Sequence, residues 1–209
     1  MKSNNFQLFI LLILFSMFMR FSLNNLLDIS ELRLESLTNQ LGENNFEKIV
    51  GFQQRWQWIV YVIDPLLILL KITVITLVLD IGCFFFNTKI KFGRLFNIVV
   101  KAEFIFLLVI VFKTIWFYFF QTDYTFEDIQ YFYPLSAINI VGYKDLQDWL
   151  IYPFQVLNLF EIAYWFILAF LIGRELKLGI DKGLSIVLSS YGVGLLVWVV
   201  GVVFLSPLK

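Results

Sequence analysis

The chain has 209 residues, of which 60% are hydrophobic and only 15% are charged, and its 16 basic and 16 acidic residues cancel. Soluble domains carry about 25% charged residues, so this composition excludes an ordinary water-soluble domain and indicates an integral membrane protein. The chain has one cysteine and no histidine, which excludes an intramolecular disulfide and removes the commonest metal ligand and general base. We therefore expect no metal or other cofactor and no nucleic-acid partner.

The first apolar stretch covers residues 6–23 and follows a basic residue, Lys2. A cleaved signal peptide begins with the same pattern, but it ends at a site of small residues such as A-x-A. The first 50 residues contain no alanine, and Arg20 closes the stretch. We therefore predict an uncleaved first transmembrane helix, a signal anchor, with a cleaved signal peptide as the alternative.

The segment that follows, residues 24–57, contains a predicted amphipathic helix over residues 26–42. Leucines recur along one side of it, at Leu27, Leu34, Leu37 and Leu41. Asp28 and Glu31 resemble a capping box at its start, and Gly42 is a typical helix stop. This helix is expected either to lie on the bilayer surface or cap the bundle, or to bind a partner or a second copy through its leucines.

Four further apolar stretches are long enough to cross a bilayer. They cover residues 65–86, 96–120, 153–173 and 183–205. Together with the first stretch they predict an all-α, five-helix transmembrane bundle that forms a single membrane domain over residues 1–209.

The loops 87–94 and 174–182 are rich in lysine and arginine, and in a five-span protein they share one side with Lys2. Such loops mark the cytoplasmic side, so we predict a cytoplasmic N-terminus and an outside C-terminus in a bacterial-type inner (plasma) membrane. The acidic segment 24–57 and the aromatic-rich segment 121–152 then lie outside. The second of these is too apolar for a solvated linker and is expected to re-enter the membrane or lie at its surface.

An internal repeat relates the two halves of the chain. A shift of 88 residues places residues 61–69 on residues 149–157, with Pro65 on Pro153, and the same shift places residues 95–111 on residues 183–199. This register predicts two similar hairpins, residues 65–120 and residues 153–205. Because both hairpins would run in the same direction, their pseudo-twofold axis would lie along the membrane normal.

Two similar hairpins with one extra span, and a short basic loop followed by "GLSIVLSSYGVGLL" (183–196), resemble the Yip1-type five-span membrane proteins. The resemblance covers residues 60–205 as a pattern of spans and loops. It implies a small helical bundle and a scaffolding or membrane-organising role rather than catalysis.

Several charged residues fall in or beside the predicted spans. Asp64 directly precedes Pro65 and is interpreted as the N-cap of the second span. Lys71, Lys113 and Glu161 lie on three spans at about 9–12 Å below the outer surface, counted at 1.5 Å per residue. They are interpreted as a structural ion pair, Glu161 with Lys71 or Lys113, or as a polar site for an anion or a lipid headgroup.

The remaining charges of the spans are assigned to the inner membrane surface. Asp80, Lys101 and Glu103 are interpreted there as boundary residues.

Signatures of nucleotide-binding, metalloprotease and serine-hydrolase sites are missing from the sequence, so we predict a protein that is not an enzyme. The leading hypothesis is a scaffold or accessory subunit of a membrane complex, with the lipid bilayer and other membrane proteins or a second copy as partners. The alternative is a small transporter, permease subunit or channel that uses Lys71, Lys113 and Glu161.

Overall fold

The computed structural model describes residues 2–41, 43–144 and 146–205. These residues form helices with short connections and one isolated antiparallel bridge, between Ser136 and Asn158. Four helical stretches are long and apolar enough to cross a membrane. They cover Phe6–Leu26, Trp58–Phe85, Phe92–Phe120 and Gly179–Leu205. The prediction of an all-helical fold is therefore confirmed for the described residues, and the four apolar stretches are consistent with a multi-pass membrane protein.

The first two helices are joined by a tight turn. Helix α1 covers Lys2–Leu26, and helix α2 covers Ile29–Leu41. Asp28 in the turn has a φ of 45°, a left-handed conformation, whereas an N-cap residue has extended backbone. The predicted capping box at Asp28 is therefore wrong. Leu27, predicted to lie in the amphipathic helix, is buried in this turn and lies outside α2, while the predicted stop at Gly42 lies outside the described residues.

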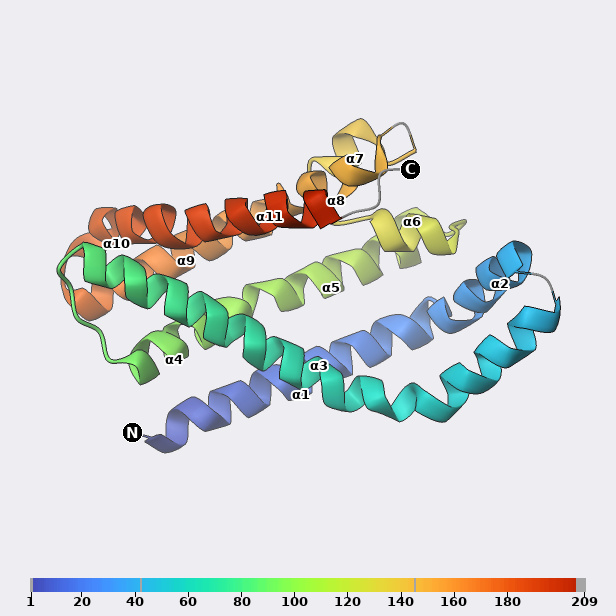
Figure 1. Ribbon diagram of the computed structural model, residues 1–209, viewed down its shortest axis with the longest axis horizontal. Helices are drawn as coiled ribbons and strands as arrows, with labels where there is room; N and C mark the ends of the chain where they lie inside the picture. Colours follow the sequence, from blue (N-terminus) through green and yellow to red (C-terminus); the bar gives the residue numbers. More distant parts are fainter. Residues whose placement is uncertain (1, 42, 145, 206–209) are drawn as a thin grey trace.

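Helix α3 is a single 43-residue helix that covers Glu43–Phe85 and contains Pro65. The predicted start of the second span at Asp64 is therefore wrong, because the helix begins well before the proline. Proline removes one backbone hydrogen bond and typically kinks a helix, and membrane helices tolerate it where neighbouring groups satisfy the freed backbone. Figure 1 shows that α3 bends within its length, as expected for a helix with an internal proline.

The third membrane stretch is built from three consecutive helical pieces: α4 (Phe92–Glu103), α5 (Ile105–Ile115) and the π-helix η1 (Trp116–Phe120). The α-helical run is interrupted at Phe104.

The last membrane stretch also contains three pieces: α10 (Gly179–Val187), the π-helix η2 (Leu188–Gly192) and α11 (Val193–Leu205). Short π segments of this kind occur often at functional sites and re-aim the side chains around them.

The predicted span 153–173 is replaced by two helices. Helix α8 covers Asp148–Val156, and helix α9 covers Leu159–Leu176. Between them Asn158 has extended backbone, and its side chain accepts a hydrogen bond of 2.8 Å from the N–H of Glu161. An asparagine that caps the next helix competes with continuation of the preceding one, which explains the break. With 18 residues and three charged side chains, α9 is not among the four long apolar stretches.

Helices α9 and α10 form a closely packed hairpin. A Cβ atom added to Gly183 would lie 2.0 Å from the carbonyl oxygen of Ala169, and one added to Gly173 would lie 2.2 Å from that of Gly179. Only glycine therefore allows the two backbones to approach this closely. The buried core of the bundle surrounds this hairpin and includes Ile72, Leu79, Val99, Leu168, Ile172 and Ile186.

The connections of the chain collect at the two ends of the bundle (Figure 1). The start of α1, the connection 86–91 and the turn between α9 and α10 lie at one end. Helix α2, the two short helices α6 (Phe126–Tyr131) and α7 (Ile138–Val141), and the end of α11 lie at the other. We call this second end the α2–α7 end.

Candidate functional site

Lys71 on α3 forms an ion pair with Glu103 at the end of α4. Its Nζ lies 2.8 Å from Glu103 Oε2 and 4.3 Å from the centre of the Phe106 ring. The Glu103 side chain is only 7% exposed, whereas that of Lys71 is 47% exposed. At 1.5 Å per residue the two lie about 21 Å and 17 Å from the ends of their helices at Phe85 and Phe92. Glu103 is therefore deep in the bundle, and its assignment to the inner membrane surface is wrong.

Asp64 forms a second ion pair between helices. Its Oδ2 accepts a hydrogen bond of 2.7 Å from Arg20 on α1. The interpretation of Asp64 as a helix cap is therefore replaced by a role in joining α1 to α3. Arg20 likewise lies within α1 rather than at its end.

Lys113 on α5 bonds to backbone rather than to an acid. Its Nζ donates to the carbonyl oxygens of Ile129 and Phe132, the second at 3.1 Å. These carbonyls belong to the end of α6, where the last turn of a helix leaves acceptors without partners and attracts a cation. Lys113 therefore holds α6 against the membrane part of the chain.

Glu161 is bonded by two aromatic residues. Its Oε1 accepts hydrogen bonds from Trp165 Nε1 at 2.9 Å and from the hydroxyl of Tyr191 at 2.7 Å. Within the described part of the chain, its other oxygen, Oε2, receives no hydrogen bond. The structure thus gives each of the three predicted site residues a partner other than the one expected: Lys71 bonds to Glu103, Lys113 to carbonyls, and Glu161 to Trp165 and Tyr191.

A row of buried groups connects the Lys71–Glu103 pair to Glu161. The fully buried Tyr164 packs its ring 5.4 Å from that of Tyr191, and its hydroxyl interacts electrostatically with Glu103. Neither the Tyr164 hydroxyl nor Glu103 Oε1 has hydrogen-bond geometry to a described group. The two charged positions are therefore linked by side chains packed in series, and Lys71 and Glu103 also interact electrostatically with Glu161 without a hydrogen bond.

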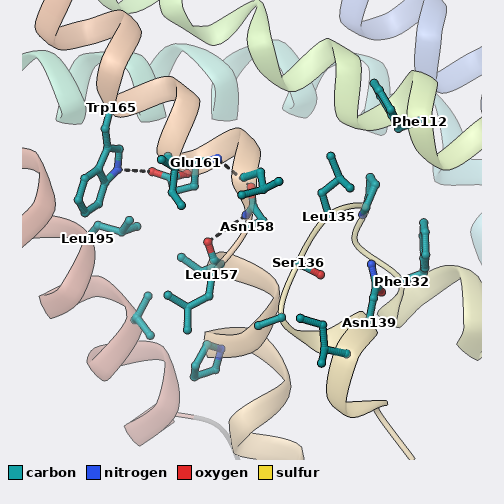
Figure 2. A pocket seen from close by; sticks show the side chains of 18 of the residues that line it. Phe112, Phe132, Leu135, Ser136, Asn139, Leu157, Asn158, Glu161, Trp165 and Leu195 are labelled. Carbon is teal, nitrogen blue, oxygen red and sulfur yellow. Dashed lines mark hydrogen bonds between the residues drawn. The ribbon is translucent and has the colours of Figure 1, made fainter.

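A cavity of about 960 Å³ lies beside Glu161, between α5, α9, α11 and the segment around α7 (Figure 2). In this view Trp165, Glu161 and Leu195 lie toward one side, with Phe112 and Phe132 toward the other. Its walls are mostly apolar and aromatic, and Glu161 is the one ionisable side chain among its described lining residues. An apolar cavity of this size with a few polar groups is the usual form of a small-molecule site.

The segment that closes the cavity from the α2–α7 end is held by a capping box. The hydroxyl of Thr125 accepts from the Asp128 N–H, while Asp128 accepts from Thr125 and from the Tyr143 hydroxyl at 2.7 Å. Burial opposes ionisation of Asp128, but the bonds from Thr125 and Tyr143 prevail and lower its pKa. Burial and the bond to Asp128 raise the pKa of Tyr143 to about 12, so its hydroxyl stays a donor at neutral pH.

Sequence reasoning missed Glu103 and Arg20 as partners. The sequence does show an acid on one span and a base on a neighbouring span. The depth of Glu103, however, is counted from the predicted helix ends, and these place it too near the membrane surface. The apolar lining of the cavity carries no motif and becomes visible only when α8, α9 and the segment around α7 come together.

No protein-family model, no curated protein and no solved structure matches the chain.

Proposed function

We propose that the chain is a non-enzymatic scaffold or accessory subunit of a membrane complex. The observation that carries this proposal is the use of the charges within the membrane helices. Six of them bond to other elements of the same chain: Arg20, Asp64, Lys71, Glu103, Lys113 and Glu161. Charges bonded in this way fix helix positions, and of these six only Glu161 also lines the cavity.

The proposal includes five spans, with α9 (Leu159–Leu176) crossing the bilayer although it is short and carries three charged residues. The placement of the start of α1 with the two basic connections at one end supports a cytoplasmic N-terminus and an outside C-terminus in an inner membrane. The α2–α7 end is then outside.

The proposal also includes the two parallel hairpins. A shift of 88 residues places the interruption at Phe104 on Gly192, the last residue of η2. It also places Glu103 on Tyr191, and each of these bonds to a polar residue of the preceding membrane helix, Lys71 and Glu161 respectively. The coincident positions of Phe104 and Gly192 and of Glu103 and Tyr191 support a duplication, although the same shift places Lys71 on Leu159, two residues before Glu161. The same arrangement fits the membrane-organising role of the Yip1-type proteins that the sequence resembles.

The alternative is a small transporter that uses Lys71, Lys113 and Glu161. The cavity beside Glu161 favours it, whereas the separate bonding partners of the two lysines oppose it.

The experiment that tests the scaffold role is chemical cross-linking in intact membranes, followed by purification in mild detergent and identification of bound proteins. We expect a partner at fixed stoichiometry that survives exchange into a second detergent. Recovery of the chain as a lone monomer under both conditions contradicts the scaffold role. Solute flux in proteoliposomes that is lost in Glu161→Gln would establish the transporter instead.

A further inference from the structure

We propose that the cavity beside Glu161 binds a compact, hydrophobic organic cation. The Glu161 carboxylate neutralises the charge of this ligand, and the surrounding walls contact its apolar surface. This inference does not depend on the scaffold role.

The first step of the argument is an excess of negative charge inside the bundle. Glu161 interacts electrostatically with Lys71 and Glu103, and Lys71 is itself bonded to Glu103 at 2.8 Å. Two carboxylates and one ammonium group leave one negative charge in this cluster without a counter-charge. The hydrogen-bond partners of Glu161, Trp165 and Tyr191, carry no charge and do not remove it. Because a buried charge is costly unless it is paired, the cluster favours a cation at Glu161.

The second step is the atom that is available to the cation. Glu161 Oε1 accepts two hydrogen bonds, whereas Oε2 receives none within the described part of the chain. Three other polar side chains of the lining, Ser136, Asn139 and Asn158, each donate to a backbone carbonyl of the chain (Figure 2). Glu161 is the one ionisable side chain among the described lining residues, so an anion would meet an acid there and no base.

The third step is the size of the cavity and the chemistry of its walls. A metal ion such as Ca²⁺ takes several oxygen ligands, whereas here one free carboxylate oxygen faces mostly apolar walls. The volume of about 960 Å³ lies in the range of small-molecule sites and is far larger than an inorganic ion requires. The single acid and the apolar walls together favour an organic cation with a large apolar surface.

The order of groups along the cavity opposes a bilayer lipid as the occupant. Glu161 is bonded to Tyr191 of η2 at the inner end of the cavity. Leu195, Leu196 and Val199 of α11 lie between this point and the α2–α7 end. A lipid keeps its charged group at the membrane surface, so its head group would have to pass these apolar residues ahead of its chains. A compact cation whose charge is covered by apolar groups passes them whole.

The cavity is accessible from the membrane. Three lining residues, Phe112 on α5, Ile162 on α9 and Leu196 on α11, belong to different helices and remain exposed, Leu196 by 64%. Their exposed surface is apolar and faces hydrocarbon in a bilayer. A hydrophobic cation can therefore reach the cavity through the bilayer, whereas a strongly hydrated cation would have to lose its water at an apolar opening.

The test measures the binding of two probes of the same shape and opposite charge to the purified full-length chain in phosphatidylcholine nanodiscs. The probes are tetraphenylphosphonium and tetraphenylborate, each measured separately by equilibrium dialysis, with binding to empty nanodiscs subtracted. We expect saturable binding of one tetraphenylphosphonium per chain. Its affinity should be at least about tenfold higher than that of tetraphenylborate, because the attraction to Glu161 becomes repulsion when the charge of the probe is reversed.

Two variants test the role of charge. Glu161→Gln keeps an acceptor for its hydrogen-bond donors but removes the charge, so the preference for tetraphenylphosphonium should be lost. Glu103→Gln changes no lining residue of the cavity, yet it leaves Lys71 to balance Glu161, so the affinity for tetraphenylphosphonium should fall about threefold or more. Glu127→Gln, at an exposed acid in the first turn of α6, is the matched control and should leave both affinities unchanged.

A further variant tests the location of the site. Leu195→Trp fills the space beside Glu161 and should abolish saturable binding of tetraphenylphosphonium. Val197→Trp is the matched control, because Val197 is exposed on the same helix outside the cavity lining, and it should bind as wild type does.

The proposal is overturned if wild type shows no saturable binding of tetraphenylphosphonium or binds tetraphenylborate equally well. It is also overturned if Glu161→Gln, Glu103→Gln or Leu195→Trp keeps the wild-type affinity for tetraphenylphosphonium. Should Glu161→Gln fail to fold by circular dichroism, the wild-type preference, Glu103→Gln and Leu195→Trp still decide the matter. The failure of this test leaves the partner experiment for the scaffold role unaffected.

Discussion

Removing Lys71 should destabilise the bundle far more than removing Glu103, its partner. Lys71→Met leaves the Glu103 carboxylate, which is 7% exposed, without its 2.8 Å bond to Lys71. Glu103 Oε1 already lacks a hydrogen bond to a described group, so both oxygens would be unpaired. Loss of one partner of a buried pair costs about 3–5 kcal/mol, and we expect about 3 kcal/mol here because the lysine itself is half exposed.

Glu103→Gln should cost only about 1 kcal/mol, since Lys71 is 47% exposed and its long side chain can reach a more polar level of the membrane. In the double variant Lys71→Met with Glu103→Gln, the buried charge is gone. We therefore expect the double variant to be more stable than Lys71→Met alone, with a coupling energy of about 2–3 kcal/mol.

The assay is reversible unfolding of the purified chain by sodium dodecyl sulfate in mixed micelles, followed by far-ultraviolet circular dichroism. Lys89→Met is the matched control, because Lys89 is exposed in the connection 86–91 and its loss should change stability by less than about 0.5 kcal/mol. Additive single effects, or a loss below about 1 kcal/mol for Lys71→Met, would show that Glu103 is neutral or otherwise stabilised and would refute the reasoning.

Three further predictions use the same unfolding assay. Gly183→Ala should lower the free energy of unfolding by about 3 kcal/mol or more, since the added Cβ would lie 2.0 Å from a backbone oxygen. Gly201→Ala, which has open space around it, should be neutral or raise the free energy of unfolding by up to about 1 kcal/mol. Equal effects of the two variants would contradict the close α9–α10 hairpin. Asp128→Asn should lower stability at neutral pH, because the pKa of Asp128 in the folded protein is below its ordinary value of 3.8. The ionised carboxylate therefore contributes its full stabilisation above pH 3.8, and this stabilisation is lost as the pH falls through the pKa of the folded state. A stability difference that persists at still lower pH contradicts this. Arg20→Met and Asp64→Asn should each cost about 1 kcal/mol without adding in the double variant, while additive losses would argue against the pair.

The sequence was sufficient to predict the class of the protein and most of its membrane helices. Apolar stretches of 20 or more residues have no stable place outside a membrane or a large core, so their existence follows from composition and length. The four long stretches observed include the predicted first, second, third and last spans. Their ends were predicted less well, because the end of a helix depends on local bonds and not on hydropathy.

Proline was the main source of error at helix ends. The sequence pattern predicts that a span begins at Pro65 and another at Pro153, but Pro65 lies far inside α3 and Pro153 lies inside α8. A proline is compatible with the first helical turn, yet membrane helices also accept it in the interior. The residue that does begin a helix in this region is Asn158, whose side-chain cap is recognisable in sequence as an N-cap type followed by Glu161 three positions later.

The candidate site could be predicted only in part, for a related reason. Sequence identifies which charged residues are costly in a membrane, and Lys71, Lys113 and Glu161 were all found in this way. Their partners depend on how helices are rotated and shifted relative to one another, which composition does not specify. Glu103 was misplaced because its depth was judged without the true start of α4 at Phe92.

The partners found in the structure change the chemistry that the site supports. Two lysines with one glutamate suggested an excess of positive charge and hence an anion. Once Lys71 is bonded to Glu103 and Lys113 to the carbonyls at the end of α6, the charge left beside the cavity is that of Glu161. The two lysines bond to other helices and do not line the cavity, so Glu161 determines which charge a ligand of the cavity would carry. A bundle stabilised by pairs between helices and a carboxylate with one unbonded oxygen are thus two results of a single arrangement of charges.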